Sequence, residues 1–347
     1  MYPAIAYAKA FQEHDPEGGV VFVGTGKALE HNILRNEGFS IEPIQVEGFV
    51  GRRMGQMLRS LWLLPNSIWR SLQILRSSPT DLVIGTGGYF SLPVVFAAWL
   101  LRIPRVVLEP NAIPGFANRV LGPIANRIFL AFESAIPFFS PSKVTVIGMP
   151  IRQAFMLEDS PPPPPSVSHV LVFGGSQGAQ AINSAMLEVV EGSAMIREQV
   201  TLTHQTGADD YERVRTAYDK LGVPVDVQPF LFDMPKELAK ADLIVCRAGA
   251  STLAELSAYG KVGILIPFPH ATHNHQEMNA RSLEAAGAAR VIRQSDLTGQ
   301  RLAEEIEKFM ADISMLWAMA DRSWALRKTH ATEQMVNACL ALVGPKA

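Results

Sequence analysis

The sequence predicts an α/β protein of two domains, each built on a doubly wound parallel sheet. Three observations predict this fold class. The 347 residues are about twice the length of a usual single domain. Short apolar runs recur along the chain, each followed by glycine-rich turns and then a helical pattern, which is typical of repeated βα units. Apolar residues make up 48 % and charged residues 18 %, with 26 Gly and 24 Pro, which disfavours disorder and coiled coil.

The apolar runs define the expected strands. In the first half they are 20–24, 81–85, 104–108, 127–131 and 143–147. In the second half they are 169–173, 200–204, 225–229, 242–246, 262–266 and 289–292. In open parallel sheets ligands collect at the carboxyl ends of the strands, so two such domains are expected to face each other across a cleft.

A run of five prolines, Pro161–Pro165, marks the expected domain boundary. Proline cannot continue a helix or a central strand, and consecutive prolines favour an extended conformation. A loop within one domain is the alternative, but a complete new βα series begins at His169. We therefore expect four parts: an N-terminal domain at 1–150, a linker at 151–168, a C-terminal domain at 169–325 and a C-terminal helix within 326–347 that packs back on the first domain.

The charge of the chain is unevenly distributed. Residues 1–150 carry 13 Lys and Arg against 10 Asp and Glu, a net +3, and the rest carry 18 against 23, a net −5. The total of −2 gives no sign of a nucleic-acid binder. The two cysteines, Cys246 and Cys339, form no disulfide framework and favour a reducing cytosol. The sequence shows no membrane-spanning run and no signal peptide.

Three glycine-rich turns follow expected strands directly and open helices. They lie at 85–89, 174–179 and 247–252. Exposed amides and the positive end of a helix dipole favour an anion, so phosphate binding is expected within this set. None has the GK[ST] ending of a P-loop, and none forms GxGxxG with an acidic residue about 20 positions further on, which disfavours a hydride-transfer enzyme.

Two polar clusters have alternative interpretations. Thr252 and Glu255 form the T-x-x-E pattern of a capping box, which would explain both residues without a ligand. His270, His273 and His275 lie within six residues and suggest a metal. The flanking prolines and polar residues favour a loop. Contact with sugar hydroxyls explains these side chains at least as well as a metal site does.

The segment 51–80 is basic and amphipathic. It contains five arginines and no acidic residue, interleaved with apolar residues at helical spacing. Core packing explains part of this stripe, and an apolar face with a basic rim is typical of a protein that lies on an anionic membrane surface. About 1 kcal/mol per basic residue near the lipid gives reversible attachment. The expected membrane residues are Arg52, Arg53, Arg59, Trp62 and Trp69.

In order along the chain, several segments resemble the MurG family of glycosyltransferases. These enzymes add N-acetylglucosamine to the membrane-anchored muramoyl-pentapeptide precursor of peptidoglycan. The matching segments, which span nearly the whole chain, are TGGYFSLPVVFAAWLLRIP, LEPNAIPGFANR, GMPIR, VFGGSQGAQAIN, HQTG, FDM, ADLIVCRAGASTLAELSAYGK and IPFPHATHNHQEMNARSLEAAGAA. The resemblance implies a GT-B fold of two Rossmann-like domains.

The resemblance also implies a donor site for UDP-N-acetylglucosamine, mainly in the C-terminal domain. Ser176 and Arg152 would lie at the phosphates, Leu231 at the uracil, Glu255 at the ribose, and His275, Gln276 and Asn111 at the sugar. Ala250, Ser251 and Thr252 would line the phosphate and ribose region. For Glu255 this favours ligand contact over capping. No cofactor and no metal are implied.

For the acceptor, undecaprenyl-pyrophosphoryl-MurNAc-pentapeptide, the resemblance implies binding by the N-terminal domain. Gly87, Gly88 and Tyr89 would face its pyrophosphate, and Trp99 would lie toward the membrane. The reaction is expected to invert the anomeric carbon as the acceptor 4-hydroxyl displaces UDP. The location is expected to be the cytoplasmic face of the plasma membrane, with other cell-wall or division proteins as further partners.

The sequence departs from the family pattern at two places. The family's first strand and its GGTGGH-type loop are absent, so the histidine that is its leading base candidate would lie before Met1. An upstream start and an inactive homologue are the two interpretations, and we expect the first. Pro110 replaces the usual glutamine of the EQNA segment. No catalytic residue is therefore assigned.

Three readings of function remain open. The first is the MurG-type transferase. The second is another GT-B enzyme, either a glycolipid transferase or a UDP-N-acetylglucosamine epimerase; an epimerase would have no use for a basic amphipathic segment. The third is a noncatalytic nucleotide-sugar binder.

Overall fold

The computed structural model describes residues 2–44 and 54–344. The chain divides into two compact units, which are described separately. Unit 1 contains Met1–Arg152 together with Lys328–Ala347, and unit 2 contains Gln153–Arg327. The chain therefore passes between the units twice, at Arg152–Gln153 and at Arg327–Lys328.

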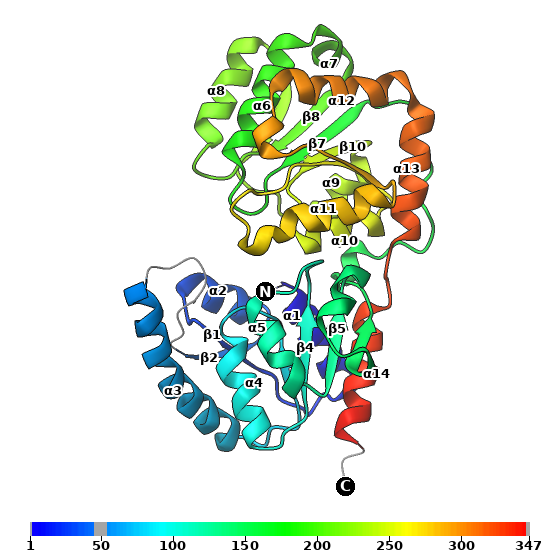
Figure 1. The fold of residues 1–347 in the computed structure, drawn as a ribbon. Coiled ribbons are helices and arrows are strands. Elements are labelled where there is room, and N and C mark those ends of the chain that lie inside the picture. Colours follow the sequence, from blue (N-terminus) through cyan, green and yellow to red (C-terminus); the bar gives the residue numbers. More distant parts are fainter. Residues whose placement is uncertain (1, 45–53, 345–347) are drawn as a thin grey trace. The chain divides into compact units, whose positions relative to one another are not determined.

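Unit 2 is a six-stranded parallel sheet in the order β12-β11-β10-β7-β8-β9 (Figure 1). Its strands are β7 (His169–Phe173), β8 (Thr201–Gln205), β9 (Val225–Gln228), β10 (Leu243–Cys246), β11 (Val262–Leu265) and β12 (Ala289–Val291). Its helices are α6 (Gln180–Gly192), α7 (Ala194–Gln199), α8 (Tyr211–Leu221), α9 (Met234–Lys240), α10 (Ala250–Ala258), α11 (His275–Ala285), α12 (Gly299–Ala311) and α13 (Ile313–Ala325).

The direction of winding reverses between β7 and β10. From β7 the chain proceeds outward to β8 and β9, and it then returns to β10 and proceeds the other way to β11 and β12. This order is the doubly wound arrangement in which ligands bind at the switch point, outside the carboxyl ends of the two central strands. The loops that follow β7 and β10 are therefore the expected place for a ligand.

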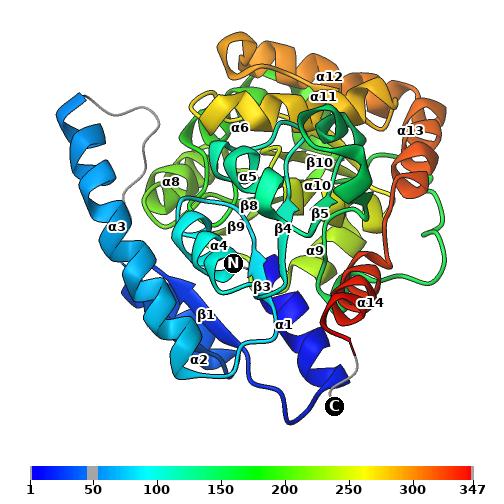
Figure 2. The same ribbon diagram turned by 60° about the horizontal axis from the view of Figure 1, so that its bottom comes forward.

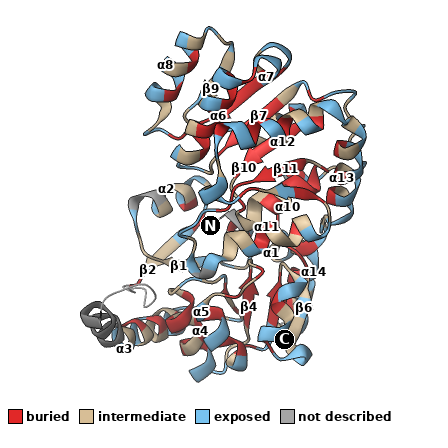
Figure 3. Cartoon of the chain, turned by 45° about the horizontal axis from the view of Figure 1, so that its top comes forward, coloured by how far each residue is buried: buried red, intermediate tan, exposed pale blue. Residues whose placement is uncertain are grey.

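The central strands of unit 2 form near-continuous apolar runs because both faces of the sheet are covered. All four residues of β10 are fully buried, as Figure 3 shows for this part of the sheet. Ile182 and Met186 of α6 and Phe309 of α12 pack in the same core cluster as Val170 and Val172 of β7. This packing fixes α6, and with it the loop that precedes α6.

Unit 1 contains two separate parallel sheets. One pairs β1 (Val21–Gly24) with β2 (Ser40–Pro43), and the other has the order β3-β4-β5-β6. The strands of the second are β3 (Val83–Gly85), β4 (Arg105–Glu109), β5 (Arg127–Leu130) and β6 (Val144–Val146). The helices are α1 (Tyr2–His14), α2 (Ala28–Asn36), α3 (Met54–Ser77), α4 (Ser91–Leu100), α5 (Phe116–Leu121) and α14 (Ala331–Val343).

The C-terminal helix α14 packs with α1 in unit 1. Met335 and Cys339 of α14 share a buried cluster with Tyr7 of α1 and with Leu108 and Phe129 of the four-stranded sheet. Helix α3 packs against α4, and Figure 2 shows α3 at the margin of unit 1. Within residues 2–44 and 54–344, none of the helices combines the length and the apolar character that crossing a membrane requires.

Every strand expected from the sequence has a counterpart that overlaps it, but β2 is an additional strand that the sequence analysis missed. Its sequence, SIEP, contains a glutamate and ends on a proline, so it lacks an apolar run. It is held instead by a parallel register with β1, in which Phe22 pairs with Ile41.

Candidate functional site

The loop after β7 and the loop after β10 lie side by side at the switch point of unit 2, because β7 and β10 are neighbouring strands. The first, Gly174–Ala179, carries Ser176 as an exposed residue. Gly175 and Gly178 have φ values of +91° and +72°, a conformation that glycine adopts at little cost. The loop opens α6 at Gln180, so its free amides and the helix dipole can receive an anion.

The backbone of the loop after β7 is in direct contact with the backbone of the loop after β8. A Cβ placed on Gly178 would lie 1.8 Å from the carbonyl oxygen of Thr206, and one placed on Gly207 would lie 2.1 Å from the carbonyl oxygen of Gln177. Both contacts are backbone against backbone. Only glycine permits this approach, which explains why both HQTG and GGSQG contain it.

Helix α10 begins two residues before Thr252, and its N-cap is Gly249. Ala250, Ser251 and Thr252 therefore form the first turn, and the capping-box interpretation of Thr252 is wrong. Glu255 lies in the second turn and is half-buried. The first turn presents backbone amides toward the switch point, where an anion would be favoured.

Arg247, which the sequence analysis did not assign, fixes the loop after β11. Its Nη1 donates to the carbonyl oxygens of Ile266 and Pro267, both at 3.1 Å, and its Nη2 donates to Gln294 Oε1 at 2.6 Å. The guanidinium also lies 5.4 Å from the ring centre of Phe268. Burial lowers the pKa of Arg247 to about 10, so the side chain remains a cation at neutral pH.

His275 and Gln276 form the start of α11, in the segment that follows β11. His275 Nδ1 donates to the carbonyl oxygen of Thr272 at 2.7 Å, which leaves Nε2 as an acceptor when the ring is neutral. Gln276 Oε1 accepts from the backbone N–H of Phe268 at 3.0 Å, which leaves its amide group available as a donor. No cluster of three or more metal-ligating side chains occurs among the described residues.

Leu231 lies between β9 and α9 and is half-buried. Its neighbours Phe230 and Phe232 make an edge-to-face contact with ring centres 5.1 Å apart, and Phe232 is 89 % exposed. This short apolar segment follows a strand on the same side of the sheet as the loops after β7 and β10.

In unit 1, the loops after the neighbouring strands β3 and β4 lie together. Gly87 and Gly88 have φ values of +87° and +74° and lead into α4, with Tyr89 half-buried beside them. A Cβ on Gly87 would lie 3.5 Å from Nδ2 of Asn118, a residue of α5, which follows the second loop. Asn111 belongs to the second loop, and Arg152 is the exposed last residue of the first segment of unit 1.

Glu109 holds the loop that carries Asn111, and the sequence analysis missed it. Its Oε1 accepts from Asn111 N at 2.9 Å and Asn111 Nδ2 at 3.2 Å. Its Oε2 accepts from Gly115 N at 3.0 Å and Asn118 Nδ2 at 2.8 Å. Burial raises the pKa of Glu109, and these four donors oppose that rise. A single glutamate in an apolar segment, LEPNA, was the only sequence signal.

The expected membrane residues are only partly described. Arg52 and Arg53 lie outside the described residues, and of Arg59 and Trp62 only the backbone, in α3, is described. Trp69 of α3 is 59 % exposed, and Trp99 and Leu100 of the adjacent α4 are 41 % and 49 % exposed.

Arg70, one of the five arginines of the segment 51–80, has an acidic partner from outside that segment. Its Nη2 lies 3.2 Å from Glu42 Oε2 of β2. The acid comes from a strand that is remote in sequence, which inspection of the local segment could not reveal.

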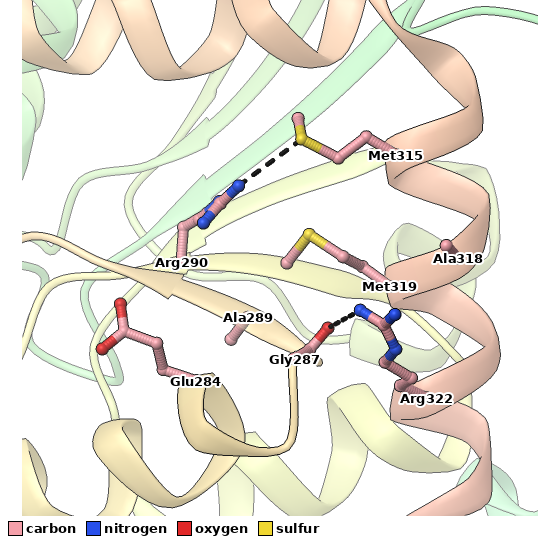
Figure 4. Close-up of a pocket in the computed structure, with 8 residues that line it drawn as sticks. All are labelled: Glu284, Gly287, Ala289, Arg290, Met315, Ala318, Met319 and Arg322. Carbon is pink, nitrogen blue, oxygen red and sulfur yellow. Dashed lines mark hydrogen bonds between the residues drawn. The ribbon is translucent and has the colours of Figure 1, made fainter.

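A cavity of about 260 Å³ elsewhere in unit 2 contains none of the expected site residues (Figure 4). It lies between the end of α11, β12 and α13, and Arg290 Nη2 donates there to Met315 Sδ at 3.5 Å. Ser176 and the first turn of α10 lie instead at the switch point, after β7 and β10.

A doubly wound sheet with two glycine-rich loops at its switch point, joined to a second parallel α/β unit, defines a protein of the nucleotide-binding α/β class. The comparisons specify the class further. A profile of the glycosyltransferase family 28 C-terminal domain matches residues 169–335, and a profile of the family 28 N-terminal domain matches residues 1–130.

Two curated relatives are named UDP-N-acetylglucosamine--N-acetylmuramyl-(pentapeptide) pyrophosphoryl-undecaprenol N-acetylglucosamine transferase. The protein of Myxococcus xanthus (strain DK1622) is 41 % identical, covering 99 % of this chain and 90 % of the relative. The protein of Syntrophus aciditrophicus (strain SB) is 40 % identical, covering 99 % and 95 %. The chain belongs to glycosyltransferase family 28, as an N-acetylglucosaminyltransferase of the MurG type.

Solved structures agree with this assignment. MurG of Acinetobacter baumannii has a TM-score of 0.79 and 28 % identity, covering 98 % of this chain and 95 % of that one. The UDP-GlcNAc 2-epimerase of Neisseria meningitidis, with a TM-score of 0.66 and 13 % identity, covers 98 % and 96 % and shares the fold alone. The expected GT-B fold class is thereby confirmed.

Proposed function

We propose that this chain transfers N-acetylglucosamine from UDP-N-acetylglucosamine to the 4-hydroxyl of lipid-linked MurNAc-pentapeptide. The observation that carries the proposal is the meeting of two helix-opening loops at the switch point of unit 2. The names of the full-length relatives support the choice of donor and acceptor.

In this proposal the donor diphosphate lies at Ser176 and at the first turn of α10, formed by Ala250, Ser251 and Thr252. Glu255 accepts from the ribose hydroxyls, and Leu231 packs against the uracil. His275 Nε2 and the free amide of Gln276 contact the sugar. The family resemblance implies these positions, and the neighbouring loops after β7 and β10 and the open hydrogen-bonding groups of His275 and Gln276 support them.

Unit 1 supplies the acceptor side. Gly87, Gly88 and Tyr89 would receive the acceptor pyrophosphate, and Asn111, held by Glu109, would reach the donor sugar. The acceptor hydroxyl attacks the anomeric carbon, the bond to UDP breaks with inversion, and the charge that develops on UDP is stabilised by loop amides and Arg152. No base is assigned to a residue of this chain.

The decisive experiment is transfer of radiolabelled N-acetylglucosamine from its UDP ester to a lipid-linked muramyl-pentapeptide, followed by extraction of the lipid. We expect label in the lipid fraction that depends on the acceptor. A parallel incubation without acceptor measures epimerised or released sugar. Binding of UDP-N-acetylglucosamine without any transfer would overturn the proposal in favour of a noncatalytic binder, and epimerised sugar would favour the epimerase.

We further propose that unit 1 attaches peripherally to the anionic cytoplasmic face of the plasma membrane. Trp69 and Trp99 are amphipathic residues exposed on the adjacent helices α3 and α4, an arrangement suited to a membrane interface. The basic residues Arg52, Arg53 and Arg59 belong to the same segment of sequence as Trp69 and would add attraction to the anionic lipid.

Sedimentation with vesicles containing anionic phospholipid tests this attachment. Changing Arg52, Arg53 and Arg59 to Ser should reduce the bound fraction, and W69S should do so as well. M195S is the matched control, because Met195 is a 46 % exposed apolar residue of unit 2. Unchanged binding of the arginine and tryptophan variants would remove this surface from the membrane role.

A further inference from the structure

A fully buried network of hydrogen-bonded polar side chains lies beside the loops after β7 and β8 in unit 2. His204 of β8 and Asn183 of α6 are both 0 % exposed, and Tyr218 of α8 is 1 % exposed. His204 Nε2 lies 3.0 Å from Asn183 Oδ1, and His204 Nδ1 lies 2.9 Å from the Tyr218 hydroxyl. Buried polar groups of this kind are costly unless each has a partner, so their orientation is specified.

The partners of Asn183 determine the direction of each hydrogen bond in this network. Asn183 Nδ2 donates to the carbonyl oxygen of Thr206 at 3.0 Å and to Asp210 Oδ2 at 2.7 Å. Neither partner can donate, so the amide nitrogen must face them and Oδ1 must face His204. His204 Nε2 therefore carries the proton, and Nδ1 accepts from Tyr218.

The charge state of His204 keeps this arrangement in place. Burial lowers the pKa of His204 to about 3, with Asp210 raising it and Arg213 lowering it to lesser degrees. The imidazole is neutral at physiological pH, and only one of its two tautomers satisfies Asn183. Asp210 is itself held by Arg213, whose Nε and Nη2 donate to its two oxygens at 2.6 and 2.8 Å.

This hydrogen-bonded network reaches the contact between the loops after β7 and β8. The Thr206 carbonyl that Asn183 holds is the same group that lies against Gly178, 1.8 Å from the position of a Cβ there. If the Asn183 amide turned over, its Oδ1 would face the Thr206 oxygen and the two acceptors would repel. The loops after β7 and β8 would then separate.

We propose that His204 is a positioning residue for the nucleotide-sugar diphosphate: its Nε2–H fixes the Asn183 amide, which holds the Thr206 carbonyl against Gly178 and so sets the amides around Ser176. His204 itself touches no substrate. The inference rests on the proposed function, because it takes the loop around Ser176 as the diphosphate site.

Two amide substitutions at His204 separate its two ring nitrogens. In H204Q the side-chain amide reaches the place of Nε2 and can still donate to Asn183. In H204N the shorter side chain reaches only the place of Nδ1 and keeps the bond to Tyr218. Both variants bury one amide, so they are matched in polarity. Y218F is a third variant that removes only the bond at Nδ1.

Calorimetric titration with UDP, corrected for the folded fraction, gives the readout. We expect H204N to bind UDP about tenfold more weakly than the unaltered chain, since a buried acceptor loses its donor, and H204Q and Y218F to stay within about twofold. In transfer assays the loss in H204N should fall on KM for the UDP-sugar rather than on kcat, because the diphosphate is held before and during reaction.

Equal UDP affinity in H204N and H204Q, whether both retained or both lost, would overturn the proposal. Absence of UDP binding by the unaltered chain would refute the proposed function itself. That outcome is distinguishable from failure of the inference alone, in which the unaltered chain still binds UDP. If H204N does not fold cooperatively, D210A takes its place: Asp210 lies at the edge of the network, and its loss should also weaken UDP binding. Unchanged binding in D210A would overturn the proposal.

Discussion

Replacing Gly178 with alanine tests the central feature of the proposed donor site, the direct approach of the backbones of the loops after β7 and β8. The added Cβ would lie 1.8 Å from Thr206 O, 2.3 Å from Thr206 C and 2.7 Å from Gly207 N. Ordinary contact begins at 3.4 Å, so the loops must separate by about 1.6 Å, the difference between 3.4 and 1.8 Å. No flexible side chain is available to move aside, because all three atoms belong to the backbone.

The magnitude follows from two contributions. A positive φ costs alanine roughly 1–2 kcal/mol, and forcing packed groups apart costs about 1–3 kcal/mol more. A separation of this size also breaks the 3.0 Å bond between Asn183 and Thr206. Because a misplacement of about 1 Å can reduce activity about 100-fold, we expect a loss of that order in UDP affinity.

Urea unfolding and titration with UDP measure the two effects. G222A is the matched control: Gly222, at the end of α8, has φ +66° against +72° for Gly178, and a Cβ there meets nothing within 4 Å. G222A should lose only the cost of the positive φ and should bind UDP normally. If G178A were as stable as G222A and bound UDP equally well, the inferred backbone contact would be wrong.

Three further predictions concern single carboxylates and one imidazole. E255A should weaken UDP-sugar binding far more than it lowers the free energy of unfolding; equal losses would mean that Glu255 is structural only. Because the pKa of His204 is lowered to about 3 in the folded chain, its contribution to stability is full above its ordinary pKa and is lost as pH falls. Between pH 7.5 and 5.5 this one group should lower the free energy of unfolding by about 1.4 kcal/mol, a component that urea titrations of H204Q should lack. E109Q should destabilise unit 1 by roughly 1–3 kcal/mol, because its amide group would face N–H donors; thermal unfolding no different from the unaltered chain would contradict the four-donor arrangement.

The fold was predictable because buried parallel strands are apolar runs bounded by glycine. The run DLIVC gave β10, and VFGGSQG gave both the end of β7 and the loop after it. β2 could not be found this way, since its backbone pairing with β1 holds a sequence with little apolar character. The start of α10 was placed too late because Gly249 caps it through backbone geometry, without a side chain that the T-x-x-E pattern could reveal.

Candidate site residues could be predicted only where a motif indicates the chemistry. Glu109 and Arg247 were missed as functional groups because their roles depend on carbonyl and amide partners from distant segments. His204 was recorded only as a letter of HQTG. Its importance lies in the identity of its two neighbours, Asn183 and Tyr218, which come from helices on either side of β8 in the sequence and meet only in the folded chain.

The strands of unit 1 are divided between a two-stranded and a four-stranded sheet, and the smaller sheet is expected to open locally first. Among the described residues, β1 and β2 share backbone hydrogen bonds with each other and with no strand of the β3–β6 sheet. A lone two-stranded sheet is marginal in water, so its persistence depends on side chains such as Leu34 and Phe39 packed beside Ile5 of α1. The sheet of unit 2 has six hydrogen-bonded strands, whereas β1 and β2 have only each other as strand partners among the described residues. Hydrogen exchange by local opening should therefore begin at the amides of β1 and β2, while the loops after β7 and β8 in unit 2 remain closed.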